Sequence, residues 1–151
     1  MKQIKFGIAG YGKMGRIREE SILNSSNAKL MSIYEVSDYS HNDKSTVQCN
    51  SFDELLKTDI DAVIVSAYVS VAADYAIRAL NSGKHVFCEK PPSMTFKEMQ
   101  EITAENQIWI QSNQIHILPI EIQVIFFDSC NFTNCANHAY QEITRKNWSI
   151  S

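Results

Sequence analysis

The chain has 151 residues, of which 44% are hydrophobic and 21% are charged, and its formal net charge is -3. This length and composition fit one globular domain with an ordinary hydrophobic core. The slight acidic excess gives no electrostatic support for binding nucleic acid or anionic lipid, so a small-molecule ligand is the better expectation.

The amino terminus, MKQIKFGIAG, runs directly into a short apolar stretch and lacks the longer hydrophobic segment of a secretory signal. This favours a cytoplasmic location. The most apolar later stretch, residues 115–127, is interrupted by polar side chains and is too short to span a bilayer. No membrane partner is expected.

Up to about residue 113, short apolar runs alternate with helix-like segments, as in repeated strand-helix-strand units with a parallel sheet. Strands are predicted at residues 4–9, 29–35, 47–49, 59–67, 85–88 and 108–111, and helices at 14–23, 71–80 and 96–106, with a brief helix carrying Phe52, Leu55 and Leu56.

Local signals place several element ends. Ser51 is a predicted N-cap, and Gly83 stands where a left-handed residue closes a helix. The Pro91-Pro92 pair must stop a strand, because proline donates no ladder hydrogen bond. Thr95 and Glu98 have the spacing of a capping box.

The predicted fold class is therefore α/β, a doubly wound parallel sheet of the Rossmann type in residues 1–113. Residues 114–151 show no clear period or capping signal and are predicted to be an irregular tail rather than a full second domain. Within the tail, residues 122–127 are β-prone and uncharged, which makes them a candidate for self-association.

A glycine loop carries the first functional signal. The pattern G-x-G-x-x-G occurs where the first strand turns into the first helix, so that the phosphates of a dinucleotide would meet free helix N–H groups. Lys13 and Arg16 flank the loop, although such side chains more often stay in solvent than reach a phosphate. The predicted cofactor-binding residues of the loop are Gly10, Tyr11, Gly12, Lys13, Met14 and Gly15.

An acidic residue strengthens this prediction. Glu35 lies twenty positions after Gly15, at the end of the predicted second strand, where a carboxylate can bind both hydroxyls of an adenosine ribose. The alternative is an exposed acid at a strand end. A carboxylate would also repel a 2′-phosphate, and the following Val36-Ser37 supplies no arginine, so NAD is favoured over NADP as cofactor.

Residues 76–93, AIRALNSGKHVFCEKPPS, resemble the most recognisable stretch of the Gfo/Idh/MocA oxidoreductases. With the glycine loop and the DIDAVIV strand, the resemblance spans most of residues 3–106 and implies a Rossmann domain followed by an α/β substrate domain. It implies a catalytic role for Lys90 beside the nicotinamide and the substrate hydroxyl, with Glu89 and Pro91 at the cofactor and a cis peptide before Pro91.

The sequence departs from the family in two places. The family's Thr-Pro-Asn-like turn and its following His are replaced by Ala67, Tyr68, Val69 and Ala72. The family's Arg-Phe-like linker and its further catalytic Asp or His are not found in residues 115–151, and His116 and His138 receive no role. A truncation, a disrupted reading frame and a divergent extension all remain open for the tail.

The cysteines favour a reduced protein without a metal. Cys49 and Cys88 fall in apolar, strand-like segments and are expected to be buried thiols. Cys130, Cys135 and His138 could supply only three zinc ligands, at spacings unlike those of standard zinc sites, so no metal site is predicted.

The resulting hypothesis is an NAD-dependent oxidoreductase of the Gfo/Idh/MocA type that acts on a sugar, polyol or similar small hydroxylated molecule, with little turnover expected of this chain alone. Two alternatives remain. One is a non-catalytic nucleotide-binding module, and the other is an interaction protein that keeps only the Rossmann fold and binds no NAD.

Overall fold

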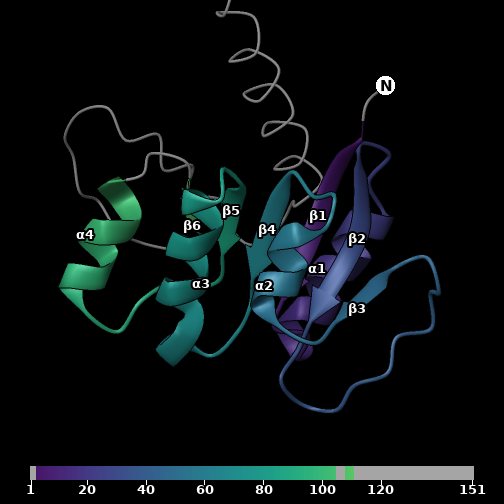
Figure 1. The fold of residues 1–151 in the computed structure, drawn as a ribbon, viewed down its shortest axis with the longest axis horizontal. Coiled ribbons are helices and arrows are strands. Elements are labelled where there is room, and N and C mark those ends of the chain that lie inside the picture. The colour runs from purple at the N-terminus through teal and green to yellow at the C-terminus, as the bar shows by residue number, and fades with distance from the viewer. Residues whose placement is uncertain (1–2, 105–107, 111–151) are drawn as a thin grey trace, which may run out of the picture.

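The computed structural model describes residues 3–104 and 108–110, which form one parallel sheet with helices on both faces (Figure 1). Six strands lie in the order β3-β2-β1-β4-β5-β6, and every neighbouring pair is parallel. The strands are β1 (Ile4–Ala9), β2 (Ala28–Tyr34), β3 (Val47–Cys49), β4 (Ala62–Val65), β5 (His85–Cys88) and β6 (Ile108–Ile110). The order reverses between β1 and β4, as the doubly wound prediction requires.

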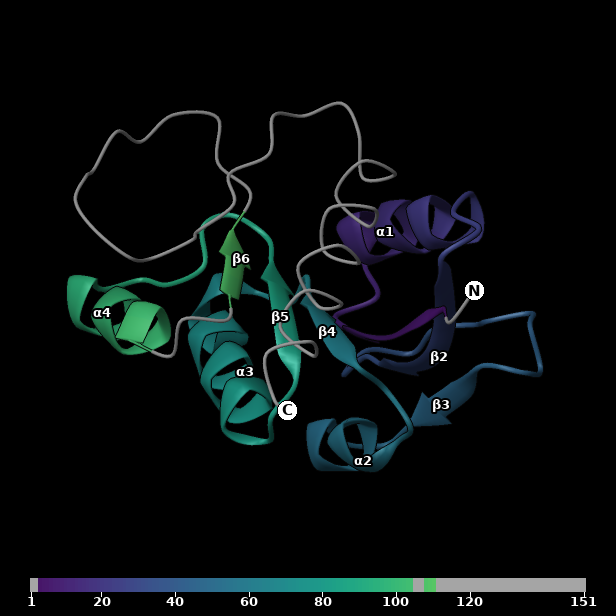
Figure 2. The ribbon, with the colours of Figure 1, turned by 90° about the horizontal axis from the view of Figure 1, so that it is seen from above.

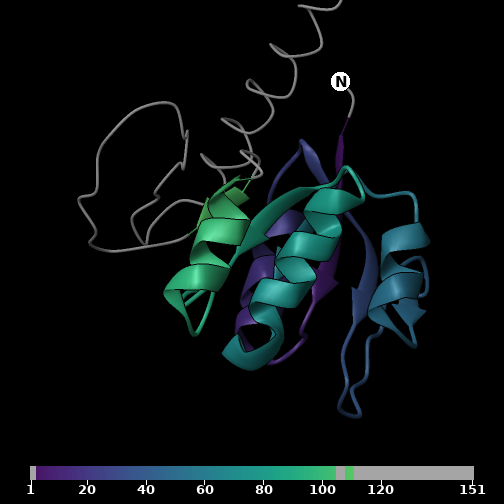
Figure 3. The same ribbon diagram turned by 60° about the vertical axis from the view of Figure 1, so that its left-hand side comes forward.

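Four helices connect the strands: α1 (Lys13–Leu23), α2 (Phe52–Lys57), α3 (Val69–Asn81) and α4 (Phe96–Ala104). Seen from above, α1 covers one face of the sheet and α2 and α3 cover the other (Figure 2). The teal helix α3 stands in front of the sheet in Figure 3, with the purple α1 behind it. Helix α4 packs beside α3.

The hydrophobic core is divided by the sheet into two layers. Alternate residues of β1 point to opposite faces, so Ile4, Phe6 and Ile8 join a cluster with Ile22 of α1. Ala9, on the other face, belongs to the larger cluster beneath α2 and α3. β4 is buried along its whole length, as expected for a central strand covered on both sides.

The predicted elements are confirmed, with shifts of one to three residues at several ends, the largest at the start of β4. β2 ends at Tyr34, so Glu35 is the first residue past the strand. Helix α3 begins at Val69 rather than at residue 71. Residues 105, 106 and 111, which the predictions placed at the ends of the last helix and strand, lie outside the described residues.

The predicted caps also form. The Ser51 hydroxyl accepts the Glu54 N–H at 3.1 Å, and Thr95 and Glu98 exchange the two hydrogen bonds of a capping box. Gly83 has a φ of 72°, the left-handed conformation expected at its position.

Cys49 and Cys88 are free, buried thiols, as predicted. Burial raises the pKa of Cys49 to about 11 and that of Cys88 to about 12. Neither thiol therefore ionises near neutral pH. Cys130 and Cys135 lie outside the described residues, as does the whole of the tail from residue 114.

No helix in the described part of the chain is long and apolar enough to cross a bilayer.

Candidate functional site

A cavity of about 690 Å³ opens at the carboxyl ends of β1, β2 and β4, where the order of the strands reverses. The loops after these three strands and the first turns of α1 and α3 form its walls. In open α/β sheets this crevice is the usual place for a ligand. The lining residues are Gly10, Tyr11, Gly12, Lys13, Met14, Arg16, Tyr34, Glu35, Val36, Ser37, Asp38, Tyr39, Ser66, Ala67, Tyr68, Val71 and Tyr75.

The glycine loop folds tightly because two of its glycines have no room for a side chain. Gly10 has a φ of 93°, and a Cβ on it would lie 2.4 Å from the backbone nitrogen of Ala67. A Cβ on Gly15 would lie 2.3 Å from the carbonyl oxygen of Gly10. The backbone of Gly10 thus lies close against the segment that follows β4, and the Ser66 hydroxyl donates a hydrogen bond to the Gly10 carbonyl at 2.6 Å.

Gly12 has different surroundings. A Cβ on this residue would meet no atom within 4 Å, although Gly12 lines the cavity. It is also the N-cap of α1, where no side chain caps the helix and no acidic residue occupies the first turn. The first turn of α1 is therefore uncapped by any side chain and adjoins the open space beside Gly12. This cradle fits a phosphate group.

Glu35 stands at the rim of the same cavity. Its Oε2 accepts the Tyr11 backbone N–H at 2.5 Å, and its Oε1 accepts the Ser37 backbone N–H at 3.1 Å. The carboxylate is thereby fixed between the glycine loop and the segment after β2. Each carboxylate oxygen can accept more than one hydrogen bond, so both retain capacity for a ligand's hydroxyls.

Tyrosine is the residue type that sequence reasoning missed in this cavity. Tyr34, Tyr39 and Tyr75 line it, besides Tyr11 and Tyr68. Burial and a hydrogen bond with Tyr34 raise the pKa of Tyr75 to about 12, so the phenol stays neutral. An apolar helical period at Tyr75 indicates only burial, because periodicity does not reveal which part of a side chain reaches a cavity.

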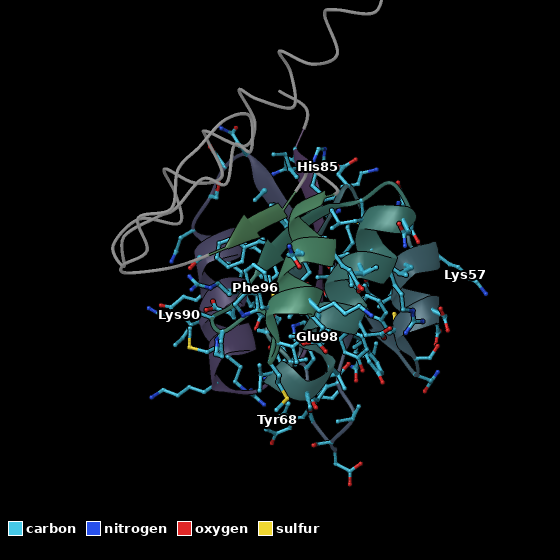
Figure 4. All side chains as sticks on the ribbon, turned by 90° about the vertical axis from the view of Figure 1, so that its left-hand side faces the viewer. Lys57, Tyr68, His85, Lys90, Phe96 and Glu98 are labelled. Atoms are coloured by element: carbon cyan, nitrogen blue, oxygen red, sulfur yellow. The ribbon has the colours of Figure 1, made fainter. Side chains whose placement is uncertain are left out.

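Lys90, Glu89 and Pro91 follow β5, one strand beyond the cavity, and none of the three lines it. Lys90 is exposed, and the peptide bond between Lys90 and Pro91 is cis, as the family resemblance implied. In Figure 4, His85 at the start of β5 lies at the top, whereas Lys90 and Tyr68 lie lower, toward the opposite ends of the strands.

The Glu89 carboxylate forms a buried ion pair with Arg18. Its Oε1 accepts a hydrogen bond from Arg18 Nε at 2.5 Å and also pairs with Arg18 Nη2. Both residues are buried, with 9% of Glu89 and 8% of Arg18 exposed, and the Arg18 guanidinium also stacks over the Phe87 ring at 5.0 Å. The structure therefore places Glu89 between β5 and α1, and its contact with the cofactor stays a prediction.

The described residues contain no group of three or more His, Cys, Asp or Glu side chains that could hold a metal ion. Cys130, Cys135 and His138 lie outside them.

The fold and the cavity together define a class of protein. A parallel sheet with reversed strand order, a glycine loop before an uncapped helix and an acid after the second strand characterise a dinucleotide-binding Rossmann domain. The chain belongs to the Gfo/Idh/MocA oxidoreductase family with an NAD-binding Rossmann fold, whose model matches residues 4–107.

Relatives with stated activities include inositol dehydrogenases. Inositol 2-dehydrogenase of Salmonella typhimurium is 29% identical over 112 residues, covering 69% of this chain and 33% of the relative. The solved structure of scyllo-inositol dehydrogenase from Lactobacillus casei with bound NAD(H) and scyllo-inositol is 30% identical, with a TM-score of 0.64, and the match covers 73% of this chain and 36% of that one.

An uncharacterized oxidoreductase of Streptococcus pneumoniae is 26% identical over 148 residues, which cover 94% of this chain and 36% of the relative. This similarity continues past residue 107, where the family model stops. The chain spans about a third of the length of the curated relatives it matches.

Proposed function

We propose that this chain binds NAD(H) as the cofactor domain of a dehydrogenase that acts on a polyol or a sugar. The pyrophosphate lies over residues 10–15, and the adenosine ribose lies on Glu35. The observation that carries this proposal is the empty space in front of Gly12, which adjoins the uncapped end of α1 and shares one cavity with Glu35.

NAD is the preferred form of the cofactor. A 2′-phosphate would lie against the Glu35 carboxylate, and the rim residues that follow it, Val36 to Tyr39, include an acid and no cation. Repulsion between like charges at hydrogen-bond distance would weaken NADP binding. Lys13 and Arg16 also line the cavity, but they belong to α1, next to the proposed pyrophosphate position.

The substrate class rests on the named relatives, two of which act on inositols by their names. Bound NAD would accept a hydride from the substrate carbon. Lys90 would meet the substrate oxygen, because it follows β5 at the carboxyl edge of the sheet, next to β4. Its ammonium group donates up to three hydrogen bonds and would stabilise the negative charge on the substrate oxygen once the hydroxyl proton has passed to water, before loss of the hydride leaves a carbonyl.

Calorimetric titration of the purified chain with NAD and with NADP tests the cofactor assignment. We expect saturable NAD binding and weaker NADP binding. A folded sample that binds neither dinucleotide would reject the assignment and favour an interaction protein that keeps only the fold.

Turnover is tested separately, by following NADH formation with inositols and sugars in the wild type and in Lys90→Ala. Positioning the substrate supplies about 7 to 11 kcal/mol of such a rate enhancement, and Lys90 is the one group among the described residues assigned to the substrate. We therefore expect little turnover from this chain alone. NAD binding without any turnover would leave a non-catalytic nucleotide-binding module as the competing function.

A further inference from the structure

The connection between β2 and β3, residues 35–46, forms one rim of the cavity and is fastened to α1 by a histidine. It appears in Figure 1 as the long blue segment between those two strands. Its first five residues, 35–39, line the cavity. Whatever fixes this connection therefore also fixes the wall on which the adenosine end of the cofactor would rest.

The fastening residue is His41. Its Nε2 lies 2.6 Å from Glu19 Oε1 on α1, and its Nδ1 lies 3.2 Å from the backbone carbonyl oxygen of Asp43. The His41 side chain is only 5% exposed and that of Glu19 is 16% exposed. The contact is therefore largely shielded from water. Charge-assisted hydrogen bonds are strongest in such a shielded environment.

Both partners of the His41 ring are hydrogen-bond acceptors. A neutral imidazole has only one N–H, so it can donate to Glu19 or to Asp43 but not to both. Only the doubly protonated ring donates at Nε2 and Nδ1 together. Both hydrogen bonds, to Glu19 and to the Asp43 carbonyl, therefore form only when His41 carries a positive charge. Deprotonation of the ring removes one of them.

Glu19 transmits this contact to the glycine loop through Tyr11. The Tyr11 hydroxyl donates to Glu19 Oε2, while the Tyr11 backbone N–H donates to Glu35 Oε2 at 2.5 Å. Burial and the hydrogen bond to Glu19 raise the pKa of the Tyr11 phenol, so it remains a donor. Tyr11 therefore connects the Glu19 carboxylate, which pairs with His41, to the Glu35 carboxylate, which is proposed to bind the ribose.

The other charged and titratable groups near His41 have hydrogen-bond or stacking partners of their own, and the Asp43 carboxylate also interacts electrostatically with His41. The Asp43 carboxylate accepts hydrogen bonds from Ser45 and Thr46, which lower its pKa. Arg16 of α1 stacks over the Tyr11 ring at 4.8 Å. The Tyr39 hydroxyl donates to the Ile33 carbonyl at 3.3 Å, and burial raises its pKa. Among these groups, Glu19 is the carboxylate that pairs with His41.

We infer that His41 is a positioning residue for dinucleotide binding, and that protonation of its ring closes the β2–β3 connection onto α1 through Glu19 and Tyr11. The inference rests on the proposed function, because it assigns the ordered rim to the cofactor's adenosine end. The direction of the pH dependence follows from the number of N–H donors on the His41 ring. Both contacts form with the ring doubly protonated, and one is lost when the ring gives up a proton. Histidine side chains in general change charge between about pH 5 and 8, so this range is the one to test.

The test measures NAD affinity of the full chain at the two ends of that range by calorimetry. In the wild type we expect a dissociation constant about fivefold higher at the upper pH, the factor that corresponds to roughly 1 kcal/mol of lost hydrogen bonding. His41→Gln has an amide that can donate to Glu19 but does not titrate, so its NAD affinity should be nearly the same at both pH values.

Two further variants make the comparison specific. Glu19→Gln removes the opposing charge and should also flatten the pH dependence. His85→Gln is the matched control, because His85 lies at the amino end of β5, away from the cavity (Figure 4). It should retain the wild-type pH dependence. A wild type with pH-independent NAD affinity, or a His41→Gln protein with the wild-type dependence, would overturn the inference.

A ligand-free measurement separates this inference from the proposed function. Hydrogen exchange of residues 37–46, corrected for intrinsic exchange rates, should show more protection at the lower pH in the wild type and no such difference in His41→Gln. If NAD does not bind at all, the proposed function fails and this readout still decides on the contact of His41 with Glu19. Equal protection of the connection at both pH values in the wild type would reject it.

Discussion

At the scale of single residues, two glycines of one loop have opposite surroundings. Gly10 has a left-handed φ and no space for a Cβ, whereas Gly12 has space on the side of the cavity. A methyl group at each position therefore distinguishes a residue required for folding from one required for the ligand.

Gly10→Ala should destabilise the protein by at least about 3 kcal/mol, because it combines an unfavourable φ with overlap against Ala67. Gly12→Ala should change stability by no more than about 1 kcal/mol yet raise the NAD dissociation constant at least about tenfold, since the methyl group takes the place of the pyrophosphate. Urea denaturation and calorimetry measure the two effects. Unaltered NAD affinity in a folded Gly12→Ala protein would contradict the proposed phosphate position.

Glu35 permits a second test at this scale. Glu35→Gln keeps the size of the side chain but loses the charge, so NAD should bind about 1.5 to 3 kcal/mol more weakly, or roughly 10- to 150-fold. NADP should lose less affinity than NAD, because the repulsion between its 2′-phosphate and the Glu35 carboxylate is also removed. The ratio of the two dissociation constants, measured by calorimetry, should therefore move toward one. Glu20→Gln, an exposed change on α1, serves as the control.

At the scale of elements, the buried pair of Arg18 and Glu89 connects α1 to the end of β5, across one face of the sheet. The residue that the family resemblance placed at the cofactor thus holds the helix whose first turn forms the phosphate cradle. The segment immediately after Glu89 carries Lys90, so this ion pair also supports the strand end at which the proposed catalytic lysine stands.

Arg18→Met should destabilise the chain by about 3 to 5 kcal/mol, because it leaves the Glu89 carboxylate buried without its cation. The double variant Arg18→Met with Glu89→Leu should regain much of this loss, since it removes the stranded charge as well. Arg78→Met provides a matched control. Arg78 pairs with Asp53 and Asp74 at the surface, where such pairs contribute less than about 1 kcal/mol. Urea denaturation that ranks the two single variants equally would refute this account.

At the scale of the whole molecule, the fold could be predicted closely from local patterns, because strands, caps and the glycine loop are encoded by neighbouring residues. Thr95 with Glu98 and Gly83 are examples in which spacing alone predicted the geometry. The site was predicted less completely. The pairs of Arg18 with Glu89 and of Glu19 with His41 join residues 71 and 22 positions apart. No local period or motif records such partners, so only the packed structure brings them together.

The last prediction concerns the whole molecule as a cooperative unit. The cavity is lined by loops that follow β1, β2 and β4, so a dinucleotide that fills it would connect both halves of the sheet. NAD at about 100 times its dissociation constant should stabilise the folded state by about 2.7 kcal/mol, which raises the Tm by roughly 10 °C for a domain of this size. At the same concentration NADP should raise it less, and Gly12→Ala should abolish most of the increase. Differential scanning calorimetry with each dinucleotide measures these shifts. A single transition that NAD leaves unmoved in the wild type would show that the cavity does not bind this cofactor, whatever the family of the chain.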